Sequence, residues 1–259
     1  MRCSLLGLAL VLAACPERQV PERGLQLVYR KPGTDSIRSV VDRRLAQLKL
    51  RAHLSEDATS LTVRVPEGAD VSRLKALFAQ RGHLEFCAED AASAARWCAL
   101  TWPAGVTPDN AGTTCTLRGA HRQELEASLA DAGTEVAWGS LGKEAVAYAI
   151  SRCLSPRIVA AEVTRNAPNL MLDFDRAGAA DFAALTKDAV GRRLVIRLEG
   201  VVTSAPIVME PITGGRAMLT TGFTQREPLE VLAAALVGGS LPAMELVKEE
   251  AWGPPSFKR

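Results

Sequence analysis

The sequence has few of the residues from which catalytic, metal and cofactor sites are built. Its three histidines, His53, His83 and His121, lie far apart and in no metal-ligand spacing. Ser204 does not stand in a G-x-S-x-G turn, and the Gly-Gly pair at residues 214–215 is not followed by the Lys-Ser/Thr of a phosphate-binding loop. These absences argue against an enzyme and against a bound cofactor or metal.

Net charge and long apolar runs are equally scarce. The 31 basic and 29 acidic residues leave a net charge of +2, and the basic residues form no cluster. No stretch approaches the roughly 20 apolar residues that span a bilayer, and the run at residues 5–12 is much too short. We therefore expect no nucleic-acid partner and no membrane-spanning helix.

The N-terminus has the features of an export signal. Arg2 precedes the apolar run, which leads into the sequence LAAC at residues 12–15, similar to a bacterial lipobox. This predicts an envelope protein on the periplasmic face, attached to the membrane only by a lipid on Cys15. The alternative is an ordinary secretory signal with an incidental cysteine. Pro16 is not the Asp associated with inner-membrane retention, which favours the outer membrane.

Four cysteines follow the signal and predict two disulfides, because an exported chain folds in an oxidising compartment. Of the three possible connectivities, we favour the one in which Cys98–Cys115 closes a Pro/Gly-rich loop and Cys87–Cys153 ties together the ends of an insertion. The alternative is a zinc site. It is disfavoured because the gaps of 11, 17 and 38 residues between successive cysteines contain no CxxC knuckle.

Residues 24–86 have the alternation and spacing of a small α/β unit. The expected elements are a strand at 25–29, a helix at 37–48, a hairpin at 51–65, a helix at 71–78 and a strand at 83–86. Thr-Asp-Ser at residues 34–36 is expected to cap the first helix, and Asp70 the second. Right-handed crossovers would close this unit into a four-stranded antiparallel sheet with two helices on one face, a ferredoxin-like βαββαβ fold.

The rest of the chain divides into a weakly patterned region and a strongly patterned one. The first is expected to hold a helix at 91–100, a loop at 101–119, a helix at 122–130 and a strand at 145–153. The second is expected to hold a strand at 170–174, a helix between Asp175 and Gly191, a hairpin around Glu199-Gly200, a turn at Gly214-Gly215, a helix through 229–236 and a strand at 244–247.

The run GRRLVIRLEGVVTSAPIVMEPITGG at residues 191–215, followed by TGFT at 221–224 and GGSLPA at 238–243, resembles a known family. It is similar to the first periplasmic domain of SecD, the accessory subunit of the bacterial protein-export translocon. Glu199 stands where that family usually has Asp, and Pro228 where it usually has Ala. The resemblance extends over most of the chain after the signal and excludes the membrane part of SecD.

The resemblance implies an α+β fold in two subdomains. A ferredoxin-like βαββαβ base would comprise residues 24–87 and 241–253, and a head with hairpins and two main helices would comprise residues 88–240. A signal peptide at residues 1–15 and a tether at 16–23 would precede them.

The resemblance also implies a binding function, because the SecD head is thought to hold a polypeptide that emerges from the translocon. Binding of an unfolded polypeptide requires exposed apolar side chains or free strand edges. The candidate contacts are five apolar residues around the predicted hairpins: Val202, Ile207, Val208, Met209 and Ile212. The alternative is that these side chains pack beneath the two head helices.

Three functions are therefore compared. The leading one is a non-catalytic, SecD-like domain that binds exported, unfolded polypeptide or assists the Sec translocon. The second is an envelope scaffold that reuses the fold without a role in export. The third is the sensing of a small ligand in the cleft between base and head. Proton coupling is not implied, because the coupling carboxylates of SecD lie in membrane helices.

Overall fold

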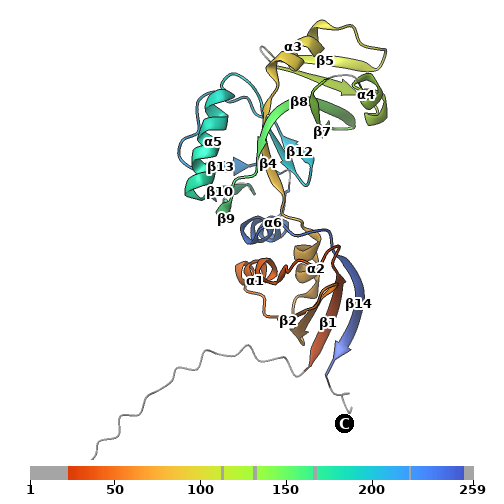
Figure 1. Cartoon of the computed structure of the whole chain (residues 1–259), viewed down its shortest axis with the longest axis vertical. Helices are drawn as coiled ribbons and strands as arrows, with labels where there is room; N and C mark the ends of the chain where they lie inside the picture. The colour runs from red at the N-terminus through yellow and green to blue at the C-terminus, as the bar shows by residue number, and fades with distance from the viewer. Residues whose placement is uncertain (1–22, 112–113, 131–132, 166–167, 222, 254–259) are drawn as a thin grey trace, which may run out of the picture.

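The structure is a computed structural model that describes residues 23–111, 114–130, 133–165, 168–221 and 223–253. It has two parts, a base that holds the first and last described strands and a head beyond it (Figure 1). The base consists of β1 (Gly24–Arg30), α1 (Arg38–Gln47), β2 (His53–Glu56), β3 (Ser60–Pro66), α2 (Val71–Ala79) and β14 (Glu245–Trp252).

The base sheet has the strand order β14-β1-β3-β2, and all of its pairs are antiparallel. Alternate residues of β1 and β3, such as Leu27 and Val63, point into a core shared with α1 and α2. This is the strand order of a ferredoxin-like fold, with β14 as the fourth strand. The predicted α+β class and the ferredoxin-like base are therefore present in the structure.

The strand predicted at 83–86 does not belong to the base sheet. It forms β4 (Leu84–Glu89), which pairs with β11 (Leu194–Leu198) in the head. Five of the six residues of β4 are buried, as expected of a strand covered on both faces, whereas β14 is largely exposed, as expected of an edge strand. We therefore propose that the base ends before β4, at residues 80–83, rather than at residue 87.

The N-terminus of α1 is capped by a residue from another strand. Glu56 of β2 accepts hydrogen bonds from the backbone N–H of Ile37 (2.9 Å) and Arg38 (3.2 Å) and from the Ser36 hydroxyl (2.8 Å). Its carboxylate also forms a buried ion pair with Lys31, at 2.7 Å. The local cap expected at residues 34–36 is therefore replaced by a long-range one, which ties α1 to the sheet. The cap expected at Asp70 is present.

The head contains fourteen elements. They are β4, α3 (Ala91–Ala99), β5 (Val106–Ala111), β6 (Thr114–Gly119), α4 (Arg122–Ser128), β7 (Glu135–Leu141), β8 (Glu144–Leu154), β9 (Ile158–Val163), β10 (Leu170–Phe174), α5 (Arg176–Asp188), β11, β12 (Val201–Ser204), β13 (Arg216–Leu219) and α6 (Arg226–Gly238). Seven of the strands form a sheet in the order β4-β11-β12-β7-β8-β6-β5, and an additional pairing of β4 with β8 closes five of them into a ring.

The prediction of a loop at 101–119 is wrong. This segment contains β5 and β6, which pair antiparallel over six residues. Pro108 in β5 pointed to a loop, but β5 is the edge strand of the sheet, and a proline is tolerated there because no donor is needed on the outer side. The helices predicted at 91–100 and 122–130 and the strand predicted at 145–153 are present, within a few residues of the expected bounds.

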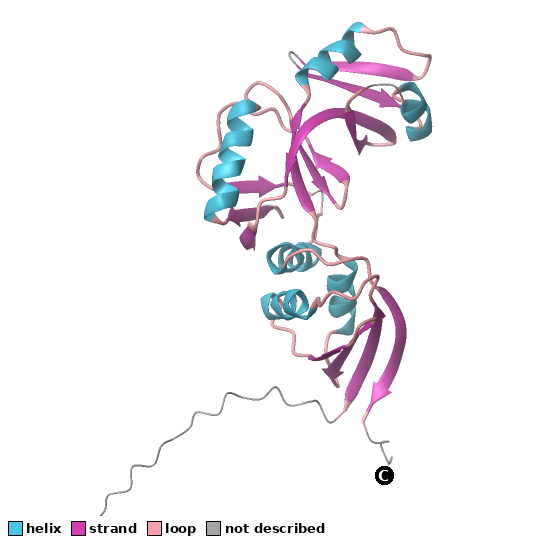
Figure 2. Ribbon diagram, in the orientation of Figure 1, coloured by secondary structure: helices cyan, strands magenta, loops and turns pink. Residues whose placement is uncertain are grey.

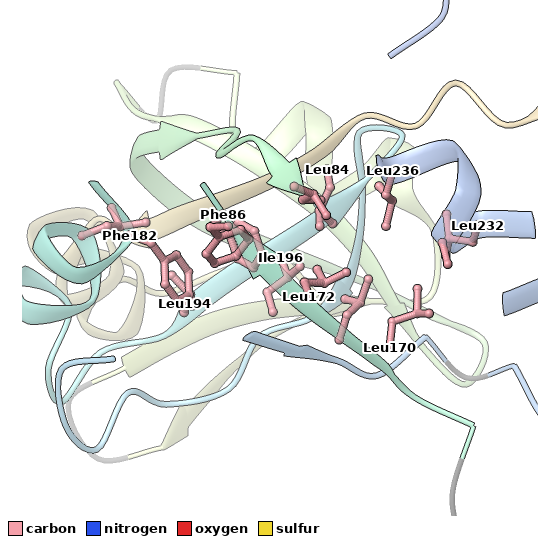
Figure 3. Packing of buried hydrophobic residues seen from close by; sticks show 14 of the residues in the cluster. Leu84, Phe86, Leu170, Leu172, Phe182, Leu194, Ile196, Leu232 and Leu236 are labelled. Atoms are coloured by element: carbon pink, nitrogen blue, oxygen red, sulfur yellow. The ribbon is translucent and has the colours of Figure 1, made fainter. Parts of the chain in front are cut away.

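A second head sheet has the order β13-β10-β9, and its inner face contributes to the largest apolar core (Figure 3). Leu170 and Leu172 pack there with Phe182 of α5, while Leu232 and Leu236 enter from α6. The turn at 214–215 therefore leads into a strand that pairs with β10 and not into a second hairpin. Figure 2 shows α6 between the base helices and the head strands.

Both favoured disulfides are formed in the structure. Cys87 of β4 is joined to Cys153 of β8, opposite residues in neighbouring strands, and Cys98 of α3 is joined to Cys115 of β6. The second bond fastens α3 to the outer strands of the seven-stranded sheet, around a small separate core that includes Trp97.

Replacing both Cys98 and Cys115 by serine is expected to lower the unfolding free energy of this outer part of the head by about 3 kcal/mol, because the bond closes a loop of 17 residues. Hydrogen exchange of the α3 and β6 amides would measure the change, with the α2 amides as the internal control. Equal loss of protection in α2 would contradict a local effect.

Candidate functional site at the base–head junction

Two backbone connections and one helix join the base to the head. The chain leaves the base between α2 and β4, at residues 80–83, and returns after α6, at residues 239–244. α6 belongs to both parts, since Leu232 packs in the head core and Ala235 in the base core. Any change in the angle between base and head must therefore alter the backbone of the two connections or the packing of α6.

Arg44 of α1 is fully buried and holds both connections at once. Its guanidinium donates hydrogen bonds to the carbonyl oxygens of Gln80 and Arg81 (2.7 Å) in the first connection. It donates to the carbonyl oxygen of Gly239 in the second connection, from Nη2 at 2.6 Å and from Nε at 3.1 Å. A further bond reaches the carbonyl oxygen of Leu77 near the end of α2, at 3.1 Å. The planar fork of arginine suits this spread of acceptors.

Two glycines make room for this side chain. A Cβ atom at Gly238 would lie 2.2 Å from Cγ of Arg44, and one at Gly82 would lie 2.6 Å from its Nη2 atom. Gly82 also has a φ of +74°, a conformation that favours glycine. The two glycines and Arg44 therefore form one packed unit at the crossing of the two connections.

The turn of the β11–β12 hairpin closes onto the first connection. The Glu199 carboxylate accepts hydrogen bonds from the backbone N–H of Gly82 (2.7 Å) and His83 (3.3 Å). The N–H of Glu199 in turn donates to the carbonyl oxygen of His83, at 2.9 Å. Glu199, one of the two positions at which the sequence departs from the SecD pattern, is therefore a contact of the head with the junction.

The junction is built for support and not for proton transfer. Burial lowers the pKa of Arg44 to about 10, and the negative charge of Glu199 acts in the opposite direction. The guanidinium therefore stays protonated at neutral pH and keeps all its hydrogen-bond donors. Within the described ranges, no group of three or more His, Cys, Asp or Glu side chains could hold a metal ion.

The five predicted polypeptide-contact residues do not form one surface. Val202 is buried inside the ring of five strands, and Val208 is buried in the large head core, where Ile212 packs against it. Only Ile207 and Met209 are exposed, with 38% and 83% of their surface accessible. Val208 therefore packs with the head helices, as the alternative predicts, whereas Val202 is buried among strands and not beneath those helices.

Exposed apolar side chains not predicted from the sequence lie near these two. Val190, two residues after α5, is 45% exposed, and its backbone pairs with that of Val208, which stands between Ile207 and Met209 in the chain. Met218 of β13 is 57% exposed and faces away from the core, opposite Met171 of β10. Val190 stands between Asp188 and Arg192, and Met218 between Arg216 and Thr220, so no apolar run in the sequence marks either residue.

The remaining predicted features are easily placed. Cys15, the predicted lipid attachment site, lies outside the described residues. His53, His83 and His121 lie in β2, before β4 and before α4. Among the helices that the structure describes, none is both long and apolar enough to cross a bilayer.

Comparison with known proteins finds similarity over part of the chain. The sequence profile of the family described as "SecDF, P1 head subdomain" matches residues 155–243, which run from before β9 to the end of the second connection. Residues 155–243 of this chain are therefore similar to the P1 head subdomain of SecDF. The SecD subunit of the protein translocase of Acidaminococcus fermentans is 46% identical over 88 residues, covering 34% of this chain and 21% of that protein.

Solved SecDF structures share the fold over more of the chain. A crystal structure of SecDF in a "Super-membrane-facing form" aligns with 92% of this chain and 32% of its own, with a TM-score of 0.60 and 20% identity. A second structure, of a SecDF component described as enhancing protein export, aligns with 86% of this chain and 98% of its own, with a TM-score of 0.56 and 20% identity. The chain spans about a fifth of the length of the A. fermentans SecD.

Proposed function

We propose that the chain is a non-catalytic, SecD-like periplasmic domain that binds exported, unfolded polypeptide or assists Sec-dependent translocation at the membrane surface. The match of residues 155–243 to the P1 head family carries this proposal, because the relatives that share this segment are named as subunits of the protein translocase.

The head offers two features that suit an unfolded polypeptide. The first is the exposed apolar group of Val190, Ile207 and Met209. The second is β13, an edge strand with β10 as its one strand partner within the described chain. Edge strands accept backbone hydrogen bonds whatever the sequence of the partner, and exposed apolar side chains add affinity without strict specificity.

The proposed lipid anchor at Cys15 agrees with the shape of the base. Gly24 at the start of β1 pairs with Trp252 at the end of β14, at the end of the base far from the head (Figure 1). A chain of nine residues reaches at most about 30 Å, so an anchor at Cys15 would keep this end near the membrane and the head farther out. This geometry favours capture of a polypeptide at some distance from the bilayer.

A photocrosslinking residue placed at Met209 or Met218 is expected to capture a stalled export substrate, because both side chains are more than half exposed. Leu141, an exposed leucine at the tip of the β7–β8 hairpin, is the matched control with 54% of its surface accessible. Crosslinked products would be resolved by gel mobility and identified by mass spectrometry, together with co-purified translocon subunits.

Several outcomes would contradict the proposal. Equal crosslinking at Leu141 would mean that any exposed apolar residue suffices. Absence of crosslinks at both head positions, with normal export after deletion of the protein and no translocon recovered, would leave the scaffold function in its place.

A further inference from the structure

A cleft of about 590 Å³ lies on one side of α6, between the base and the head. Its walls come from α1 of the base, from both connections, and from the segment that joins β8 to β9 in the head. This volume falls in the range of small-molecule sites, which are concave and combine apolar walls with a few polar groups. It exceeds the space that packing defects leave.

The polar lining of this cleft is basic. Arg43, His83 and Arg157 line it together with the hydroxyl residues Ser155 and Ser240, and none of its lining residues is acidic. Arg157 makes no side-chain hydrogen bond or ion pair with any residue that the structure describes. Two acidic side chains lie beside this lining. Glu85 is 4.0 Å from His83, and its other oxygen is held by Arg197 at 3.0 Å. The Glu199 carboxylate accepts from the backbone N–H groups of Gly82 and His83 and lies 3.9 Å from Arg81.

The end of α6 does not cancel this charge. The C-terminus of a helix repels anions through its free carbonyl groups. Here Nε of Arg43 donates to the carbonyl oxygen of Gly238 at 3.0 Å, and Arg44 binds that of Gly239. Both carbonyls are therefore occupied, while the Nη atoms of Arg43 keep their donors for another acceptor.

A second cavity of about 560 Å³, on a different set of junction residues, provides an internal comparison. Its lining carries charges of both signs: Arg73 and Arg226 both pair with Glu230, at 2.8 and 3.0 Å, and Glu162, Lys49 and Arg165 also line the cavity. The second cavity is therefore lined by both signs of charge, whereas the first cleft is lined by basic groups and by no acidic residue.

The rest of the first cleft is apolar. Leu84, Ile158, Val159 and Val237 line it, and Val159 is 49% exposed although its neighbour Ile158 is buried. We propose that this cleft binds a small amphipathic anion, with a carboxylate or phosphate group between Arg43 and Arg157 and an apolar portion against Val159. Since Arg43 belongs to the base and Arg157 to the head, the bound anion would also fix the two subdomains relative to each other.

The proposal is tested by calorimetric titration of the purified protein, residues 23–253, with octanoate and with octyl phosphate. The two probes share the apolar chain and separate a carboxylate from a phosphate as the preferred group. Saturating anion is expected to raise the Tm by about 5 °C. Arg157→Gln is expected to weaken binding at least tenfold, since it removes a charge-assisted hydrogen bond. It should leave the Tm of the free protein unchanged.

The controls decide between this site and non-specific binding. Arg51→Gln removes an exposed arginine of the base that lines neither cavity, and it should leave the affinity unchanged. Octanol should bind at least tenfold more weakly than octanoate. The proposal is overturned if neither anion binds, if Arg157→Gln and Arg51→Gln behave alike, or if octanol or inorganic phosphate binds as well as the amphipathic anions. Crosslinking to export substrates does not enter this test, so the two proposals can fail separately.

Discussion

Replacing Arg44 by alanine is expected to lower the free energy of unfolding by about 4 kcal/mol, the largest effect of any single substitution considered for this chain. Four backbone carbonyls lose a charged donor, and those of Leu77 and Gly239 lie at helix ends, where no further turn donates an N–H to them. A cavity also remains in place of the side chain. Urea unfolding followed by far-UV circular dichroism would measure the loss.

A double-mutant cycle with Gly238 tests the packing explanation directly. Gly238→Ala alone is expected to cost about 2 kcal/mol, because its Cβ would meet Arg44 Cγ at 2.2 Å. In the Arg44→Ala background Cγ is absent and the contacts that remain are the backbone N and Cα of residue 44, at 3.1 and 3.3 Å, so the same change should cost about 1 kcal/mol or less. Strict additivity would refute the contact, and Arg51→Ala, an exposed position, should be neutral.

Replacing Glu56 by glutamine is expected to destabilise the base by about 3 kcal/mol. The change leaves the buried ammonium of Lys31 without a counter-charge and weakens the cap of α1. Glu67→Gln is the matched control, since Glu67 is exposed in the loop after β3. Thermal unfolding at pH 7 would compare the two variants.

The pH dependence gives a second readout for Glu56. Burial alone would raise the pKa of its carboxyl group, but hydrogen bonds from Lys31, Ile37 and Ser36 outweigh it and lower the pKa from 4.5 to about 2. A depressed pKa stabilises the fold above pH 4.5, and this contribution of about 3 kcal/mol is lost as pH falls from 4.5 to 2. Glu56→Gln should lack this component of acid destabilisation. A variant that retains the wild-type pH profile in this window would contradict the assignment.

Local patterns in the sequence predicted most elements but not the partner of each strand. The strands at 84–89 and 245–252 each follow a helix, and either of them could complete a βαββαβ sheet. The deciding property is burial: β4 is covered on both faces and β14 is not. A short alternating run does not report how many of its faces are covered, so the nearer strand was assigned to the base.

Only one residue in the sequence, a charged side chain at a buried helix position, indicates the junction. Arg44 stands within the apolar stripe of the first helix, between Val41 and Leu45, where a charged side chain requires buried partners. Those partners are backbone carbonyls up to 195 residues away, and no side-chain motif marks them. The wrong prediction of Val202 and Val208 as polypeptide contacts has the same cause. A hairpin with apolar residues on both faces resembles a binding surface unless the elements that cover its second face are known.

The pairing of β1 with β14 has a mechanical consequence. Gly24 and Trp252 face each other at the same end of adjacent antiparallel strands, so a pull between them would open the inter-strand hydrogen bonds one after another, like a zipper. Strands loaded in this way yield at lower force than strands loaded in shear. Tension between the proposed lipid attachment before Gly24 and a partner that holds the Trp252 end of β14 would peel that strand away first, while the rest of the fold bore little of the load.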